Sequence, residues 1–240
     1  MIPRVIHYCW FGGKPLPELA VRCIASWREH MPDCEIKQWD EDNFDVYSVP
    51  YTAEAYRLGK FAYVSDYARL WILNQQGGIY LDTDVEMLQS LDDMLEQGPF
   101  MGQEQPEHPG DASLHCAMGL GMACEAGHPF IVRMLNHYQH THFVSLTGRQ
   151  GDTIVDITRR LLTDEPVEPM ADGIVRCAGF TIYPWQWLCP LNYFTGQLTT
   201  TPLTHAIHHY AASWVGDFPN QSLLQRLQRR LHAAWIRARK

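Results

Sequence analysis

The stretch SDYARLWILNQQGGIYLDTDV, residues 65–85, joins a helical pattern to a short apolar run that ends in two aspartates. Its first part repeats apolar residues at helical spacing, and the glycine pair that follows predicts the end of a helix. The apolar run then predicts a buried strand. Because side chains two apart on a strand point to the same face, we expect Asp82 and Asp84 to point together at the carboxyl end of that strand.

The same alternation of patterns extends upstream. Residues 5–10 and 34–39 are typical of strands, and residues 16–30 between them are typical of a helix. Alternating strands and helices predict an α/β domain with a mostly parallel central sheet flanked by helices. Farther along the chain we expect helices near residues 128–142 and 150–163, and short strands within residues 115–124, 179–190 and 205–214.

The composition bounds the class of protein. The chain of 240 residues is 46% hydrophobic and 19% charged, which suits one globular domain with a substantial core. A net charge of −8 argues against a nucleic-acid partner. The first residues lack the pattern of a signal peptide and no apolar run has the length of a membrane span, so we expect a cytoplasmic protein. The seven cysteines include no CxxC pair and are expected to be buried, reduced thiols.

The last part of the chain differs from the rest. Residues 218–240 contain no acidic residue and carry five arginines and one lysine. Their apolar residues can share one helical face, so we predict a basic amphipathic helix after a main domain of residues 1–217. Such a helix can dock on the anionic inner face of a membrane, or pack on the domain with its basic face in water. The pattern fits both alternatives.

The two acids predict a particular chemistry. Neighbouring carboxylates repel each other unless one is protonated or a cation lies between them. Open α/β sheets bind ligands at the carboxyl ends of their strands. Mg²⁺ and Mn²⁺ prefer oxygen ligands and often bind carboxylates together with substrate phosphates. Asp82 and Asp84 therefore predict a divalent-cation site for a phosphorylated donor; the alternative is a solvated turn after a strand.

Three segments together resemble one family. They are IPRVIHYCWFGG (2–13), SDYARLWILNQQGGIYLDTDV (65–85) and IHHYAASW (207–214), and in this order they resemble glycosyltransferase family 32, which includes bacterial capsular-polysaccharide transferases and yeast mannosyltransferases. The central block is also similar to the catalytic domains of the clostridial glucosylating toxins. The resemblance implies a GT-A fold, a nucleotide-sugar donor and a divalent metal, Mn²⁺ or Mg²⁺.

The resemblance also implies which residues bind the donor. Trp10 matches an aromatic residue that stacks on the donor base, although a tryptophan of the core would fit the same pattern. Asp66 and Arg69 match the pair that holds the donor sugar and ribose. Further donor contacts match Tyr80, Ser213 and Trp214, of which the last two close over the diphosphate.

Metal binding is implied for the acidic motif and for a histidine near the end of the chain. Asp84 matches a direct metal ligand, and Asp82 matches a residue that contacts ribose, sugar and metal-bound water. Histidine is a reasonable ligand for Mn²⁺ in a site made mainly of oxygen atoms. His208 and His209 are adjacent, so only one of them can face the site from a strand. We favour His209, which falls closest to the family spacing.

The chain departs from the family pattern on the acceptor side. It keeps Gly127-His128-Pro129 but lacks the asparagine that family members often carry shortly before this helix start. Glu104 and Asp152 are weak candidates for contacts to the acceptor. The family implies a saccharide or a lipid-linked acceptor, but the sequence assigns no residue to it.

The family is retaining, so the expected reaction moves a hexose with its α configuration kept, in polysaccharide biosynthesis, from a UDP-sugar in preference to a GDP-sugar. The expected catalytic set is Asp66, Arg69, Asp82 and Asp84, with the metal acting on the leaving diphosphate. One alternative is a catalytically weak sugar-nucleotide or carbohydrate-binding module. Another is a nucleotidyl- or phosphoryl-transfer enzyme, which the lack of Walker spacing in WFGGKP (10–15) disfavours.

Overall fold

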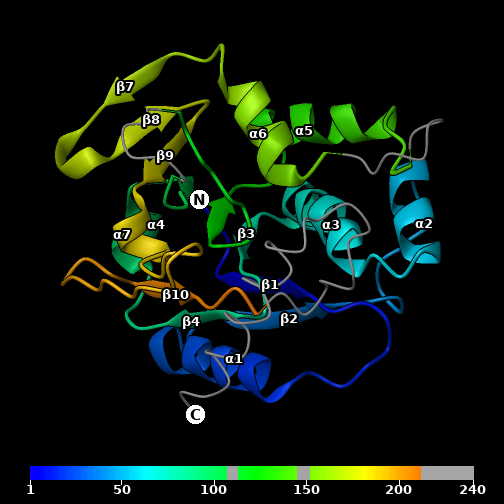
Figure 1. Ribbon diagram of the computed structural model, residues 1–240, viewed down its shortest axis with the longest axis horizontal. Helices are drawn as coiled ribbons and strands as arrows, with labels where there is room; N and C mark the ends of the chain where they lie inside the picture. The colour runs from blue at the N-terminus through cyan, green and yellow to red at the C-terminus, as the bar shows by residue number, and fades with distance from the viewer. Residues whose placement is uncertain (107–112, 145–151, 212–240) are drawn as a thin grey trace.

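The computed structural model describes residues 1–106, 113–144 and 152–211, which form two sheets covered by helices (Figure 1). The strands are β1 (Val5–Cys9), β2 (Glu35–Trp39), β3 (Gly78–Tyr80), β4 (Val85–Met87), β5 (Phe100–Gly102), β6 (Met122–Cys124), β7 (Val167–Pro169), β8 (Val175–Cys177), β9 (Phe180–Tyr183) and β10 (Ala206–His208). In this part of the chain the large sheet has the order β2-β1-β3-β6-β5-β9-β8-β7, and a small sheet pairs β10 with β4.

The large sheet is mixed but mostly of one direction. β1 is parallel to β2 and β3, and β5 is parallel to β9, whereas β6 and β8 are antiparallel to their neighbours. Strands β2, β1, β3, β5, β9 and β7 therefore point one way. The predicted α/β class with a mostly parallel central sheet is confirmed.

Helices cover the large sheet on both faces. They are α1 (Glu18–His30), α2 (Pro50–Arg57), α3 (Phe61–Gln76), α4 (Asp92–Glu96), α5 (Pro129–Gln139), α6 (Ile154–Leu162) and α7 (Trp185–Leu188), with a 3-10 turn at Ala171–Gly173. Helices α3, α5 and α6 lie on one side of the sheet, and α1 lies on the other beside β4 (Figure 1).

The buried side chains divide according to the strand alternation. Ile79 and Leu81 belong to the hydrophobic cluster that contains Trp27 of α1, whereas Tyr80 belongs to the cluster that contains Val64 of α3. The strand thus fills a core on each face of the sheet, as its apolar sequence predicts. The seven cysteines are free thiols, and all except Cys34 are buried, as expected.

The turn between α3 and β3 depends on its two glycines. Gly77 and Gly78 have φ angles of 64° and 103°, which side chains rarely adopt. A Cβ on Gly77 would also lie 2.8 Å from the backbone nitrogen of Ala126, and one on Gly78 would lie 2.7 Å from the carbonyl oxygen of Val5. The glycine pair therefore allows the helix to turn directly into the centre of the sheet.

The prediction that Asp82 and Asp84 end one strand is wrong. Strand β3 ends at Tyr80, and the chain then turns and begins β4 of the small sheet at Val85. The backbone N–H of Val85 donates to the carbonyl oxygen of Asp82 at 3.0 Å, which closes this turn. The two acids lie on a bend between two sheets. Helix α2 and strands β7 and β8 were also not predicted.

His7 joins three parts of the fold from a fully buried position on β1. Its Nδ1 accepts from the indole N–H of Trp39 at 3.1 Å, and its Nε2 lies 3.0 Å from the carbonyl oxygen of Gly77. These contacts require the neutral ring with its proton on Nε2. Burial lowers the pKa of His7 to about 4.

We predict that the protein loses stability as the pH falls from about 6.5 towards 4, because the unfolded chain then binds a proton at His7 that the native state excludes. The loss attributable to this residue is roughly 3 kcal/mol at full effect. Urea denaturation of His7→Gln at several pH values should show a flatter dependence, with the exposed His140→Gln as control. An unchanged pH slope in His7→Gln would contradict this account.

Candidate metal and donor site

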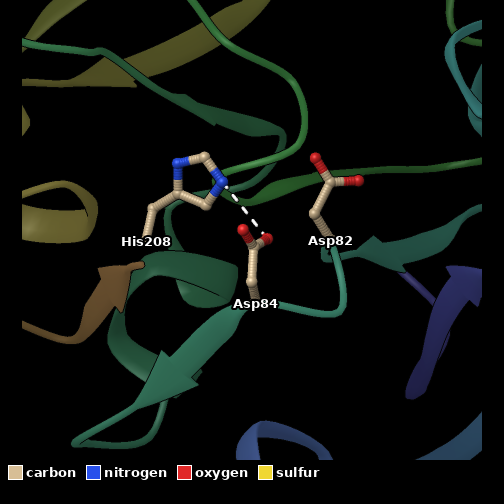
Figure 2. A group of neighbouring side chains, drawn as sticks. All are labelled: Asp82, Asp84 and His208. Atoms are coloured by element: carbon tan, nitrogen blue, oxygen red, sulfur yellow. Dashed lines mark ion pairs between the residues drawn. The ribbon is translucent and has the colours of Figure 1, made fainter. Parts of the chain in front are cut away.

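Asp82, Asp84 and His208 form a cluster where the large and small sheets meet. One ligand atom from each residue can be chosen so that all three atoms lie within 4.8 Å of one another. Asp84 lies between the other two side chains, and its carboxylate faces the His208 ring (Figure 2). Two oxygen donors and one nitrogen donor at this spacing suit Mn²⁺ or Mg²⁺ more than a soft metal.

Backbone and side-chain contacts fix the Asp84 carboxylate. Oδ2 accepts the backbone N–H of Ala211 at 2.7 Å, and Oδ1 lies 3.2 Å from His208 Nε2. The carbonyl oxygen of Asp84 accepts the N–H of His209 at 2.9 Å. The end of β10 therefore holds Asp84 by its main chain and presents the histidine ring to it, which is the kind of support that orients a metal ligand.

Charge stabilises this pair in the absence of a cation. Burial alone would raise the pKa of Asp84, but the charge and hydrogen bond of His208 outweigh it and lower that pKa to about 2. Burial would lower the pKa of His208, but Asp84 raises it well above its usual value. Asp82, Asp84 and His208 would hold a cation here, and its charge would replace the neutralisation that the His208 proton provides.

The preference for His209 over His208 is not supported by the geometry. His209 Nε2 lies 2.7 Å from Glu86 Oε2, on the side of the strand that faces away from the cluster. His208 ends β10 opposite Val85, and Asp84 lies on the bend just before β4, so the course of this bend decides which histidine its carboxylate meets. The sequence does not predict that bend, and both histidines suit the chemistry.

Arg69 is the central group next to Asp82. Its guanidinium is 4% exposed and lies 3.1 Å from Asp66 Oδ1 and 3.2 Å from Asp82 Oδ1. It also lies 4.8 Å above the ring of Tyr80, whose hydroxyl donates to Asp82 Oδ1 at 3.1 Å. Burial raises the pKa of Asp66 to about 6 although Arg69 lowers it in part. The structure therefore brings together four of the predicted site residues: Asp66, Arg69, Tyr80 and Asp82.

A glycine that the sequence did not indicate makes room for Asp82. The carbonyl oxygen of Gly119 accepts the N–H of Asp82 at 2.9 Å. A Cβ on Gly119 would lie 1.8 Å from Asp82 Oδ2 and 2.9 Å from Arg69 Nη1. Any side chain at this position would therefore push the carboxylate out of its place. The sequence motifs give no role to Gly119, because it has no charged or aromatic side chain.

Trp10 lines a cavity at the edge of the large sheet. The cavity has a volume of about 570 Å³, and its lining residues are Trp10, Gly12, Gly13, Gln38, Asp40, Glu41, Asp42, Tyr56 and Phe61. Most of these residues end or follow β1 and β2, whereas Tyr56 lies on α2 and Phe61 begins α3, so the cavity lies at the carboxyl ends of parallel strands. Trp10 is only partly buried, and its indole N–H donates to the carbonyl oxygen of Lys14 at 2.6 Å. It is therefore not enclosed in the core.

Part of the predicted site falls beyond the described residues. Ser213, Trp214 and the predicted basic helix of residues 218–240 lie outside them, as does the end of the predicted main domain. In the portion that the structure describes, none of the helices combines the length and apolar character that a bilayer span requires. Asp152, a weak acceptor candidate, pairs instead with Arg160.

Sequence comparison agrees with the class of site that the geometry defines. Residues 17–101 match the family model described as the glycosyltransferase sugar-binding region containing the DXD motif. That range contains Asp66, Arg69, Asp82 and Asp84. The predicted resemblance is confirmed: residues 17–101 match a DXD-type sugar-binding region of glycosyltransferases.

Particular relatives are more distant. Inositol phosphoceramide mannosyltransferase 3 of Schizosaccharomyces pombe is 26% identical over 158 residues, which cover 61% of this chain and 41% of that protein. Mannosyl phosphorylinositol ceramide synthase CSH1 of Saccharomyces cerevisiae is 26% identical over 171 residues, which cover 64% and 40% respectively. The chain thus spans about two fifths of the length of these curated relatives.

Solved structures of glycosyltransferases also match the chain. The PaToxG glycosyltransferase is 18% identical with a TM-score of 0.47, and the match covers 67% of this chain and 69% of that one. The galactosyltransferase LgtC in complex with donor and acceptor sugar analogues is 14% identical with a TM-score of 0.46, and the match covers 96% and 95%.

We predict that His208→Ala weakens Mn²⁺ binding at least about tenfold, because it removes the nitrogen donor that faces Asp84. The matched variant His209→Ala should bind Mn²⁺ within about twofold of the wild type, since His209 faces Glu86. Isothermal titration with Mn²⁺ measures both. Equal effects of the two substitutions, or a larger effect of His209→Ala, would contradict the assignment.

A second prediction concerns the space beside Asp82. Gly119→Ala should keep the fold but displace the Asp82 carboxylate, and so weaken Mn²⁺ binding by roughly tenfold. Gly59→Ala is the control for a general loss of stability, because its φ of 66° strains an alanine but a Cβ there would meet no atom within 4 Å. Circular dichroism checks the fold, and the same titration measures the affinity. Wild-type affinity in folded Gly119→Ala would show that the position of Asp82 does not matter.

Proposed function

We propose that the protein transfers a hexose from a nucleotide-sugar donor to a saccharide or lipid-linked acceptor, with retention of the α configuration and with a bound divalent cation. The observation that carries this proposal is the cluster of Asp82, Asp84 and His208, which lies directly beside the buried Arg69 in the DXD sugar-binding region. A purely structural acidic turn would not need a histidine from a second sheet aimed at it.

The residues present fit a divalent cation. Asp84 Oδ1 and His208 Nε2 face each other, and Asp82 Oδ2 is not used by the contacts of Oδ1 to Arg69 and Tyr80. Mn²⁺ is the favoured ion because one of the donors is an imidazole nitrogen, with Mg²⁺ as alternative. When bound, such an ion acts as a Lewis acid that stabilises the charge of a leaving diphosphate.

The residues around Arg69 fit the donor sugar and ribose. Asp66 and Asp82 offer carboxylate oxygens that accept hydrogen bonds from hydroxyl groups, and the Arg69 charge keeps Asp82 in place. Arg69 adds fixed positive charge beside the leaving group, where it stabilises developing negative charge without reorganisation. The acceptor hydroxyl then attacks the anomeric carbon on the face from which the diphosphate leaves; the bond between that carbon and the phosphate oxygen breaks, and the hydroxyl proton passes to the leaving phosphate oxygen.

The Trp10 cavity fits the base of the donor. Trp10 and Tyr56 provide aromatic faces for stacking, and no lysine or arginine is among the lining residues that the structure describes. A diphosphate would be repelled by Asp40, Glu41 and Asp42 in that cavity, so it is directed towards the cation. A UDP-sugar remains the proposed donor in preference to a GDP-sugar.

The acceptor and the place of action are proposed from the relatives. Their names describe mannosyl transfer and an inositol phosphoceramide, which supports a lipid-linked acceptor for this chain as well. A lipid-linked acceptor requires contact with a membrane surface, and we propose that residues 218–240 provide it through their basic side chains at the cytoplasmic face. Alternatively, the acceptor is a saccharide, and the transfer is a step of polysaccharide biosynthesis.

We predict that the wild type releases nucleotide from at least one member of a panel of UDP- and GDP-sugars with Mn²⁺, and none in a chelator. Asp84→Asn should lower this turnover on the order of a thousandfold, since a metal that acts as a Lewis acid contributes several kcal/mol. Glu86→Gln, which alters a carboxylate two residues away that pairs with His209, is the control.

The outcomes separate the alternatives. Nucleotide binding without any turnover would favour the catalytically weak sugar-nucleotide-binding module. Full turnover in chelator, or an Asp84→Asn protein as active as the wild type, would rule out the metal-dependent reaction.

A further inference from the structure

Glu104 is a carboxylate that the donor and metal contacts do not use. It follows β5, which points in the same direction as β3, so it lies at the same edge of the sheet as the acidic motif. Its backbone N–H donates to the carbonyl oxygen of His115 at 2.9 Å. Its side chain is partly buried, and its carboxylate is close enough to His208 and Tyr210 for both to act on it electrostatically. The Tyr210 hydroxyl itself lies 3.0 Å from Cys189 Sγ. The carboxylate thus lies beside the cluster.

Aromatic rings continue from this carboxylate to the surface. The Tyr210 ring lies 4.2 Å from that of His208 and 5.0 Å from that of Tyr193, and Tyr193 lies 5.3 Å from Phe194. Tyr193 and Tyr210 are partly buried, whereas Phe194 is 56% exposed. The three rings therefore form a continuous apolar strip that leads from solvent to the candidate metal site.

The two segments that carry these groups are tied together. The Asn192 amide donates to Gln105 Oε1 at 2.6 Å, which joins the residue after Glu104 to the residue before Tyr193. Tyr210 has a φ angle of 48°, a left-handed conformation that is costly for a non-glycine residue. Such strain persists only where the surrounding contacts fix the backbone, and here the Tyr210 ring packs against the rings of His208 and Tyr193.

The position of this group relative to the donor residues is informative. Asp82 and His208 flank Asp84 in the view of Figure 2, and the ligand atoms of all three residues converge. Arg69 and Asp66 belong to the Asp82 side, whereas Tyr210 and Glu104 belong to the His208 side. A transfer reaction needs its two substrates on either side of the reacting bond, and this arrangement leaves the His208 side for the second substrate.

The chemistry of the group selects the kind of ligand. A carboxylate accepts hydrogen bonds from hydroxyl groups, and aromatic rings pack against the apolar face of a ring, which together suit a polyhydroxylated ring. Glu104 and Asp84 are both carboxylates, so a phosphate placed between them would be repelled. The ring that enters should therefore be neutral where it meets the protein.

We propose that Glu104, Tyr210 and Tyr193 bind the neutral sugar or cyclitol ring of the acceptor, with Glu104 accepting a hydrogen bond from one of its hydroxyl groups. This inference rests on the proposed function for the identity of the second substrate. It gives the acceptor residues that the family pattern left unassigned, and it gives Tyr210 the role of positioning Glu104 and packing against the ring.

The test measures acceptor use and donor use separately. Nucleotide release from the donor in water needs no acceptor, and transfer is followed with a panel of methyl glycosides and myo-inositol. Glu104→Gln keeps the size of the side chain but loses its charge, so we expect the acceptor KM to rise about tenfold or more. Release of nucleotide in water should stay within about twofold of the wild type. Tyr210→Phe should give a smaller rise in acceptor KM, because the ring remains.

Glu165→Gln is the matched control, because that carboxylate pairs with Arg133 away from the site. Ligand-observed NMR with the same panel, Mg²⁺ and UDP or GDP gives a readout that does not need turnover: Glu104→Gln should lose the signal that the wild type shows. A parallel fall in nucleotide release and transfer, or a loss of thermal stability in Glu104→Gln that matches the loss of transfer, would overturn the proposal. So would the absence of any panel signal with the wild type. Failure of the proposed function would instead appear as no nucleotide release from any donor.

Discussion

The buried guanidinium of Arg69 is the interaction on which the rest of the site depends. It neutralises Asp66 within its own helix and Asp82 at the end of β3, and thereby joins α3 to the sheet edge. Breaking such a buried pair would leave an uncompensated charge, which is costly. Helix α3 reaches this position because the glycine pair returns the chain directly into β3. The helix, the turn and the acidic motif are therefore one structural unit.

A second unit completes the site from a different sheet. Asp84 directly precedes β4, and His208 ends β10, the strand that pairs with β4, so the small sheet brings the two residues together. The bend at residues 81–84 joins this unit to the Arg69 unit, and Gly119 provides the room for the bend. Cation binding would join the two units, since its ligands come from both. That is why the site lies between the two sheets and not on either one alone.

The sequence predicts the first unit well and the second poorly. Helix α3, the glycine turn and the proximity of Asp66, Arg69 and Asp82 follow from patterns that are local in sequence. The choice between His208 and His209 depends on the course of the bend before β4, which a local pattern does not contain. The break between β3 and β4 was missed because alternation continues through it. Gly119 was not predicted because it contributes by lacking a side chain, which leaves room for the Asp82 carboxylate.

We propose that the Arg69 unit and the small sheet together hold one divalent cation. Anomalous diffraction at the manganese absorption edge, from crystals of the wild type soaked in Mn²⁺, tests it most directly. We expect one strong anomalous peak at bonding distance from Asp84 and from His208 Nε2, on the side that faces Asp82. A peak next to His209 and Glu86 would contradict the claim. So would the absence of a peak at the cluster in crystals that were soaked in Mn²⁺ together with a nucleotide and show the nucleotide bound.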